Sequence, residues 1–217
     1  GHEASGTIVE LGEQAAAKGY KVGDKVTMFP VSFCGGCEWC KRGMTQYCIN
    51  SKPTGAFAEY VCIPESNVII IDESLPEDVV AFFDAFGNAT HTALQFDVVG
   101  EDVLVTGAGP IGIMAAAICK KNGARQVIIT DMNEYRLELA RKMGLFAINI
   151  GASDLGEVMR EHHMVEGFDV GLEMSGSDAA LHQLLDNMRN GGKIALLGIF
   201  SRDAKIDWNQ VIFKGLT

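Results

Sequence analysis

The chain has 217 residues, which is enough for one large domain or two ordinary ones. Hydrophobic residues make up 47% of it and charged residues 21%, a composition that excludes an extended disordered protein. Its net charge of -10 leaves no basic face for a phosphate backbone, so we expect no nucleic-acid partner. No apolar run approaches the roughly 18 residues that span a bilayer, and we expect a cytoplasmic protein with no membrane partner.

The chain opens on Gly1, His2 and Glu3, which place an imidazole beside a carboxylate. Both groups are zinc ligands, but adjacent residues of a strand point to opposite faces of the sheet. On spacing alone, an ordinary polar strand end is therefore favoured over a metal site. Because the first residue is glycine rather than methionine, we also expect the sequence to begin inside a longer protein.

Residues 1–84 form the first expected domain. They contain short alternating apolar stretches broken by glycine and proline, such as GTIVELG and KVGDKVTMF. This pattern is typical of an irregular antiparallel β-barrel. A cysteine-rich segment inside it is expected to protrude as a separate lobe.

Four cysteines stand close together in that segment, separated by two, two and seven residues: Cys34, Cys37, Cys40 and Cys48. A thiolate lies about 2.3 Å from zinc, so the four sulfurs of a single site must converge, and Gly35 and Gly36 supply the freedom to turn. A disulfide framework is the alternative, but cysteines at such short intervals pair poorly with one another. We therefore predict a structural zinc site. Cys62 and Cys119 lie in apolar segments and are expected to be buried.

The segment 81–96 is predicted to be helical and to join the two halves of the chain. Asp84 interrupts its apolar run, VVAFFDAFGNA. An acid at such a point is either a helix N-cap or a group directed into a cleft, and both interpretations stay open. The second expected domain occupies residues 85–217.

From about Glu101 onward, short β-branched runs alternate with amphipathic stretches of helix length. This rhythm predicts an α/β fold of the Rossmann class, with a doubly wound parallel sheet. The predicted strands are 102–107, 126–131, 146–150, 168–174 and 193–199. The predicted helices are 111–122, 133–143, 153–163 and 178–189.

The run DVLVTGAGPIG contains a glycine triplet, G-x-G-x-x-G, between a predicted strand and a predicted helix. Gly107 suits the tight turn, Gly109 lets a pyrophosphate approach the backbone, and Gly112 lets the helix pack against the strand. The N–H groups at the start of the helix attract phosphate. The triplet in this context predicts a dinucleotide site.

Asp131 ends the second predicted strand, 19 residues after Gly112, where a carboxylate accepts both hydroxyls of the adenosine ribose. The alternative is that Asp131 caps the next helix, but Asn133 is the better candidate for that cap. An acid here also repels a 2′-phosphate, which favours NAD over NADP. Arg136 either serves such a phosphate or packs over the adenine, and beside Asp131 we favour the second role.

Leu197, Gly198 and Ile199 are predicted to end the fifth strand. The carboxyl edge of the sheet is where contacts to the nicotinamide half of the cofactor are expected. The alternative is a buried strand with no ligand.

Taken in order, the motifs GHE-x-x-G, C-x2-C-x2-C-x7-C, GAFAEY and G-x-G-x-x-G resemble those of the medium-chain zinc-dependent alcohol dehydrogenase family. The resemblance covers essentially the whole chain. It implies a GroES-like β-barrel domain, partial here and carrying a zinc lobe, followed by a Rossmann domain. It also implies NAD and two zinc ions per full-length subunit, one catalytic and one structural. Family members act on small molecules and are usually dimers or tetramers, so a homo-oligomer is expected.

Carried over by position, the resemblance implies roles for individual residues. His2 and Glu3 become catalytic-zinc residues, and the four clustered cysteines become the structural-zinc ligands. Asp84 matches an acid that lies close to the catalytic zinc and assists proton relay without a firm bond to the metal. The implied NAD contacts are Ile111, Asp131, Arg136 and the stretch from Leu197 to Ile199.

In this family the remaining catalytic-zinc cysteine lies upstream of the GHE triplet. The segment from Phe213 to Gly215 resembles the segment that precedes the sixth strand of the family's sheet. We therefore expect both ends to continue in a longer protein and the 217-residue polypeptide to be inactive alone. Within the family, FDAFGNATHTAL and TDMNEYRLELARKMG resemble enzymes that oxidise a hydroxyl-bearing amino acid with NAD. Two alternatives stay open: another zinc polyol dehydrogenase, of the sorbitol or butanediol type, and a non-catalytic zinc-stabilised NAD-binding module.

Overall fold

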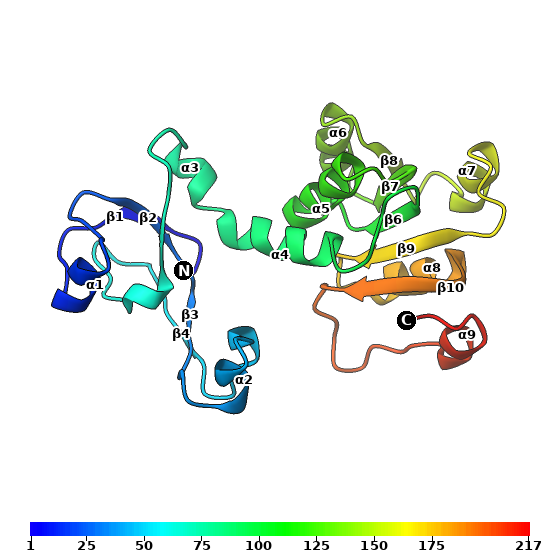
Figure 1. The fold of residues 1–217 in the computed structure, drawn as a ribbon. Coiled ribbons are helices and arrows are strands. Elements are labelled where there is room, and N and C mark those ends of the chain that lie inside the picture. The colour runs from blue at the N-terminus through cyan, green and yellow to red at the C-terminus, as the bar shows by residue number, and fades with distance from the viewer. The chain divides into compact units, whose positions relative to one another are not determined.

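The computed structural model describes all residues from 1 to 217, and its contacts group them into two compact units, Gly1–Ala85 and Phe86–Thr217 (Figure 1). The domain boundary that the sequence predicts, between residues 84 and 85, stays a proposal. None of the helices combines the length and the apolar character needed to cross a membrane.

The first unit contains two small antiparallel sheets. The three-stranded sheet has the order β1-β2-β5 and is built from β1 (Ser5–Thr7), β2 (Lys25–Met28) and β5 (Val68–Ile70). The two-stranded sheet pairs β3 (Val31–Ser32) with β4 (Lys52–Pro53). The short helices are α1 (Glu13–Ala17), α2 (Glu38–Lys41), η1 (Thr45–Tyr47), η2 (Glu65–Asn67) and α3 (Glu77–Val80).

A buried amide ties the strands of this unit together. The side chain of Asn67 is 1% exposed, and its Nδ2 donates to the carbonyl oxygens of Phe29 at 2.8 Å and Val31 at 3.0 Å. A buried polar group is stable only when it is paired, so Asn67 fixes the path between β2 and β3. That path leads into the loop that carries the cysteines.

Part of the first unit differs from the barrel pattern read from the sequence. The segment GAFAEY forms no strand, and the side chains of Phe57 and Tyr60 are 95% and 75% exposed. Cys62, which follows them, is exposed, so the prediction that it is buried was wrong. Its apolar neighbours do not pack against a core here. Cys119 is fully buried, as predicted.

The second unit is built on a parallel five-stranded sheet with the order β10-β9-β6-β7-β8 (Figure 1). In chain order, the strands spread in both directions from β6, which is the doubly wound arrangement. The direction of winding reverses between β6 and β9. The strands are β6 (Asp102–Thr106), β7 (Gln126–Asp131), β8 (Phe146–Asn149), β9 (Phe168–Glu173) and β10 (Met188–Leu196).

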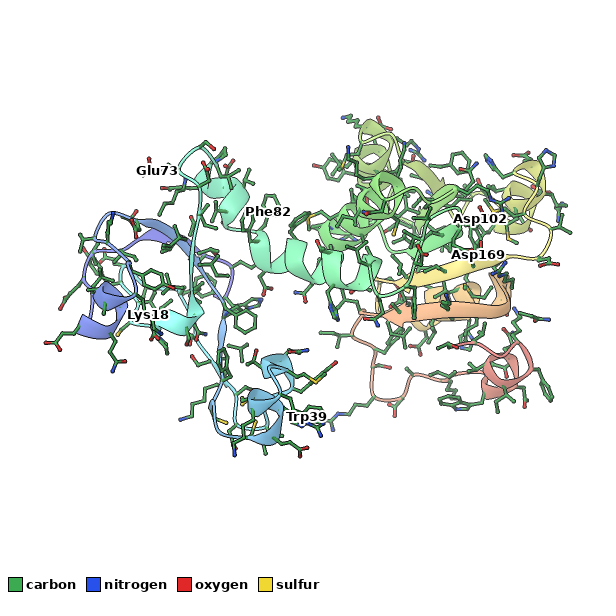
Figure 2. The ribbon with its side chains drawn as sticks, in the orientation of Figure 1. Lys18, Trp39, Glu73, Phe82, Asp102 and Asp169 are labelled. Atoms are coloured by element: carbon green, nitrogen blue, oxygen red, sulfur yellow. The ribbon has the colours of Figure 1, made fainter.

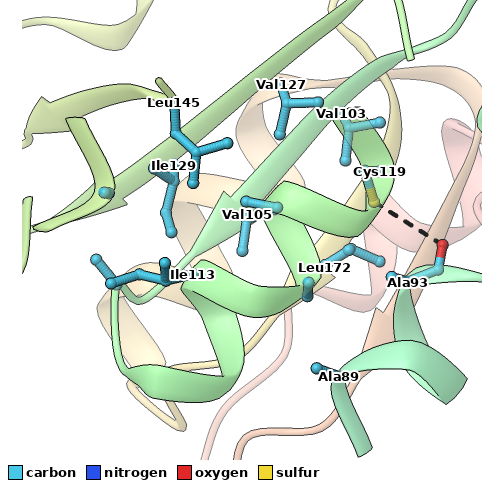
Figure 3. Packing of buried hydrophobic residues seen from close by; sticks show 14 of the residues in the cluster. Ala89, Ala93, Val103, Val105, Ile113, Cys119, Val127, Ile129, Leu145 and Leu172 are labelled. Carbon is cyan, nitrogen blue, oxygen red and sulfur yellow. Dashed lines mark hydrogen bonds between the residues drawn. The ribbon is translucent and has the colours of Figure 1, made fainter. Parts of the chain in front are cut away.

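Helices cover both faces of this sheet because its strands are apolar on both sides. Val103 and Val105 belong to one core cluster, together with residues of α4 and α5, while Leu104 belongs to the other, together with residues of α7 and α8. Figure 3 shows the first cluster, in which the thiol of Cys119 points to the carbonyl of Ala93 at 3.9 Å. The helices are α4 (Phe83–Ala93), α5 (Pro110–Lys121), α6 (Glu134–Lys142), α7 (Leu155–Glu161), α8 (Asp178–Asn187) and α9 (Trp208–Phe213).

An ionic network closes the amino edge of the sheet, where Asp102 and Asp169 lie side by side (Figure 2). The carboxylate of Asp102 is 1% exposed and receives both Nε, at 2.9 Å, and Nη2 of Arg125. Asp169 accepts the backbone N–H of Asp102 at 2.7 Å and pairs with Arg189 at 2.6 Å. Burial, and then the hydrogen bond with Asp169, raises the pKa of Glu101. These contacts stabilise the edge opposite the expected nucleotide site.

Two predicted elements differ from the structure by three or more residues at one end. The helix predicted over 81–96 is α4, which begins at Phe83 and ends at Ala93. The strand predicted over 193–199 begins at Met188 and ends at Leu196, with an irregular register before Lys193. It ends there because the N–H groups of Leu197 and Gly198 both donate to the backbone oxygen of Glu173, which turns the chain out of the ladder.

Candidate functional site

The four clustered cysteines converge in the first unit, in the loop between β3 and β4. Their sulfur atoms all lie within 4.8 Å of one another, and none forms a disulfide. Cys37 is the N-cap of α2, and its Sγ lies 3.5 Å from that of Cys40. Cys48 Sγ accepts the backbone N–H of Cys34 at 3.3 Å. Gly35 takes a φ of +68°, which fits the sharp turn expected of it.

The environment of these thiols suits a divalent soft metal. Backbone N–H groups of Gly36 and then Cys37 lower the pKa of Cys34 to about 6. Burial, and then the neighbouring thiol of Cys37, raises the pKa of Cys40 to about 12. Four thiolates cannot share this small volume without a cation between them. Four sulfur donors and no open position match a structural zinc site, so the residues fit the metal that the sequence predicts.

A second cluster joins His2, Glu3 and Asp84. Their ligand atoms also lie within 4.8 Å of one another, and His2 Nε2 is 3.3 Å from Asp84 Oδ2. The expectation that adjacent residues point to opposite faces fails because β1 begins only at Ser5, so His2 and Glu3 are not part of a strand. Asp84 lies in the first turn of α4 with its side chain 22% exposed. An imidazole nitrogen and carboxylate oxygens are zinc donors, so this set also fits the metal.

The glycine triplet forms a strand–turn–helix junction in the second unit. Gly107 has a φ of +97°, and a Cβ there would lie 2.9 Å from the Cβ of Ser175. A Cβ on Gly112 would overlap the carbonyl oxygen of Gly107, so only glycine lets α5 approach the strand. Gly109, the N-cap of α5, has open space where its Cβ would be. A pyrophosphate fits this space, in front of the free N–H groups of the helix.

Asp131 lies at the end of β7 and is oriented by the same turn. Its Oδ2 accepts the N–H of Ala108 at 2.8 Å, and its Oδ1 accepts the N–H of Asn133, also at 2.8 Å. Asn133 caps α6 by accepting the N–H of Arg136 at 3.3 Å, as predicted. Arg136 Nη1 lies 3.8 Å from Asp131 Oδ2. A carboxylate has about four acceptor positions, so Asp131 keeps room for ribose hydroxyls.

Comparison with known proteins identifies the family. A model described as an alcohol dehydrogenase GroES-like domain matches residues 1–73, and one described as a zinc-binding dehydrogenase matches residues 110–217. The chain is 54% identical over 222 residues to the L-threonine 3-dehydrogenase of Shewanella baltica (strain OS185). The matched region covers 100% of this chain and 64% of that protein. The chain belongs to the zinc-dependent medium-chain alcohol dehydrogenases.

Solved structures of similar dehydrogenases have the same fold. An alcohol dehydrogenase from Thermus sp. ATN1 is 27% identical with a TM-score of 0.88, covering 100% of this chain and 66% of that one. An oxidoreductase/dehydrogenase of unknown specificity from Escherichia coli is 28% identical with a TM-score of 0.92, covering 100% and 64%. This chain therefore spans less than two thirds of the length of the curated relatives it matches. Zinc and NAD are the cofactors of this dehydrogenase family. The two ligand clusters fit zinc, and the glycine triplet with Asp131 fits NAD.

The remaining predicted NAD contacts are the stretch from Leu197 to Ile199 and Ile111. Leu197, Gly198 and Ile199 lie beyond the end of β10, and Ile199 is 94% exposed, so these residues form a loop at the carboxyl edge and not the end of a strand. Ile111 is partly buried and packs against the core of the sheet. Sequence analysis missed Glu173, a fully buried acid at the same edge. The acid within the apolar run FDVGLEMSG was the available signal.

Proposed function

We propose that the protein containing this chain is an L-threonine 3-dehydrogenase, which oxidises L-threonine to 2-amino-3-oxobutanoate with NAD. The observation that carries this proposal is the 54% identity to such enzymes along the whole chain. It is supported by a zinc-compatible cluster with nitrogen and oxygen donors and by a dinucleotide turn that ends on an acid. We further propose a cytoplasmic homo-oligomer, a dimer or a tetramer.

The metal cluster would serve the alcohol group of the substrate. His2 and Glu3 would hold a zinc ion, which would supply Lewis-acid polarisation of the substrate hydroxyl. Asp84 lies beside His2 and is partly exposed, which supports a role for its carboxylate in accepting a proton and passing it to water. The four-cysteine lobe has no open ligand position, and its proposed role is structural.

The carboxyl edge of the parallel sheet would bind and orient the coenzyme. N–H groups at the start of α5 would hold the pyrophosphate, while Asp131 would accept the ribose hydroxyls. The guanidinium of Arg136, already held near Asp131, would cover the adenine. The loop from Leu197 to Ile199 would contact the nicotinamide half.

The test is a substrate panel for the protein expressed from its complete reading frame. Formation of NADH is followed with L-threonine, sorbitol and butanediol at equal concentrations. We expect the highest kcat/KM with L-threonine. Preference for a polyol would instead identify the sorbitol or butanediol type. NADH binding and tightly held zinc with no turnover of any of these alcohols would identify a non-catalytic module. His2→Ala should abolish turnover without changing NADH affinity, and His182→Ala, on helix α8 of the second unit, is the matched control that should change neither.

A further inference from the structure

The carboxylate of Glu173 occupies an unusual place for a charged group. Glu173 is the last residue of β9 and is fully buried. Its register partners are Thr106 on β6 and Leu196 on β10, so it lies among the ends of three strands, next to the point where the winding of the sheet reverses. A buried charge is costly unless it is fully paired, and the fold must therefore supply partners for it.

The partners of this carboxylate are hydroxyl and backbone N–H groups and not cations. Oε1 accepts the N–H of Ser175 at 2.9 Å, the hydroxyl of Ser175 and, at 3.3 Å, the hydroxyl of Thr106. The two oxygens share the N–H of Gly176, which lies 3.2 Å from Oε1 and 3.1 Å from Oε2. No Lys, Arg or His forms an ion pair with Glu173. Such an arrangement fixes the backbone of the β9–α8 loop against the end of β6.

Two further loops pack against this point. The N–H groups of Leu197 and Gly198 donate to the backbone oxygen of Glu173 at 2.9 and 3.0 Å. A Cβ on Gly198 would overlap Oε2 of Glu173, and one on Gly176 would lie 2.6 Å from the carbonyl oxygen of Ile199. The turn at Gly107 is in contact with Ser175, as described above. Glu173 therefore holds the β9–α8 loop through its carboxylate and the Leu197–Gly198 loop through its backbone oxygen, and the Gly107 turn packs against the first of these loops.

We infer that Glu173 is a positioning residue for the nicotinamide half of the dinucleotide site. In a doubly wound sheet the two halves of a dinucleotide lie on opposite sides of the reversal point. Asp131 and β7 lie on the adenosine side, so the ends of β9 and β10 lie on the nicotinamide side. Glu173 does not face solvent, so it acts through the backbone of the Gly176 and Gly198 loops. This inference rests on the proposed function.

The test is Glu173→Gln in the 217-residue chain, with NADH and AMP titrated separately by calorimetry. The amide group keeps the shape of the side chain, but its NH2 group replaces one of the two oxygens that share the N–H of Gly176 and sets a donor against a donor, so that loop shifts. We expect the Kd of NADH to rise about tenfold and that of AMP to change less than about twofold. AMP reports the adenosine half, and a general loss of folding would weaken both ligands. Glu101→Gln, the same change at the opposite edge of the sheet, should alter neither Kd.

Ser175→Ala provides a second variant in case Glu173→Gln does not fold. It removes one hydroxyl donor and leaves the carboxylate. We expect the Kd of NADH to rise about threefold and the Kd of AMP to stay unchanged. Equal changes for NADH and AMP, or no change in either folded variant, would overturn the positioning role. If the wild-type chain binds AMP and NADH with the same affinity, the nicotinamide half is not engaged and the inference fails. If it binds neither, the proposed function fails as well.

Discussion

Removal of zinc from the cysteine lobe should unfold residues 33–51 and leave the parallel sheet intact. Cys48 is the only buried residue in that stretch, and neither α2 nor η1 contains one. Trp39 and Tyr47 stack edge to face at 5.5 Å, and Arg42 lies 5.8 Å over the Trp39 ring. These contacts contribute roughly 1–2.5 kcal/mol together.

Ordering the backbone of this stretch costs about 1 kcal/mol per residue, which far exceeds those contacts. A zinc ion bound by four thiolates contributes on the order of 10 kcal/mol and makes up much of the difference. Without the metal, the lobe therefore has too little buried surface to remain folded.

Hydrogen exchange followed by mass spectrometry measures this directly. After treatment with a strong chelator, we expect rapid exchange of the α2 amides, including those of Lys41 and Arg42, which now donate to carbonyls one helical turn earlier. Amides of β6 and β7 should keep their protection, which serves as the internal control. If the α2 amides stay protected in metal-free protein, hydrophobic packing holds the lobe and the reasoning is refuted.

Three further predictions concern the ionic and metal-binding residues. Because the pKa of Glu101 is raised in the folded protein, its contribution to stability is complete below the unfolded pKa of about 4.3 and is lost as pH rises through the folded pKa. Glu101→Gln should therefore raise the Tm near pH 7 and leave the Tm near pH 4 unchanged. A Tm difference that does not depend on pH would contradict this. Arg125→Ala leaves the buried carboxylate of Asp102 without its donors and should lower the free energy of unfolding, measured with urea, whereas Arg125→Lys should lower it less. Equal small losses in the two variants would show that the pair is not important. His2 is well exposed, so we expect the zinc that remains after treatment with a weak chelator to be bound by the four cysteines. Metal analysis should find the same amount of this zinc in His2→Ala as in the wild type and none in Cys40→Ser. Loss of this zinc in both variants would show that the two clusters are not independent.

The features that the sequence predicted well are local. The turn at Gly107 and the cap at Asn133 depend on residues a few positions apart, and both are present. The four cysteines also lie close together in sequence, and their convergence follows from their spacing and the glycine between them. The apolar strands of the parallel sheet were predictable because they are buried on both faces.

The features that were missed depend on residues far apart in the chain. The network of Glu173 joins Thr106, at the end of β6, to Gly176 and Gly198, which lie on two different loops, and no short motif reports such a contact. The approach of Asp84 to His2 likewise spans most of the first unit, and only the family resemblance led us to expect it. The early start of β10 was missed because Gly191, with a φ of +75°, has the local signature of a turn.

Comparison of NADH and NADPH binding to the 217-residue chain tests the central claim, that these residues form an NAD site closed by an acid. Titration followed by nicotinamide fluorescence gives both Kd values under identical conditions. The carboxylate of Asp131 accepts ribose hydroxyls and repels a 2′-phosphate, so NADH should bind at least about tenfold more tightly. Equal affinity, tighter binding of NADPH, or no binding of either coenzyme would contradict the account.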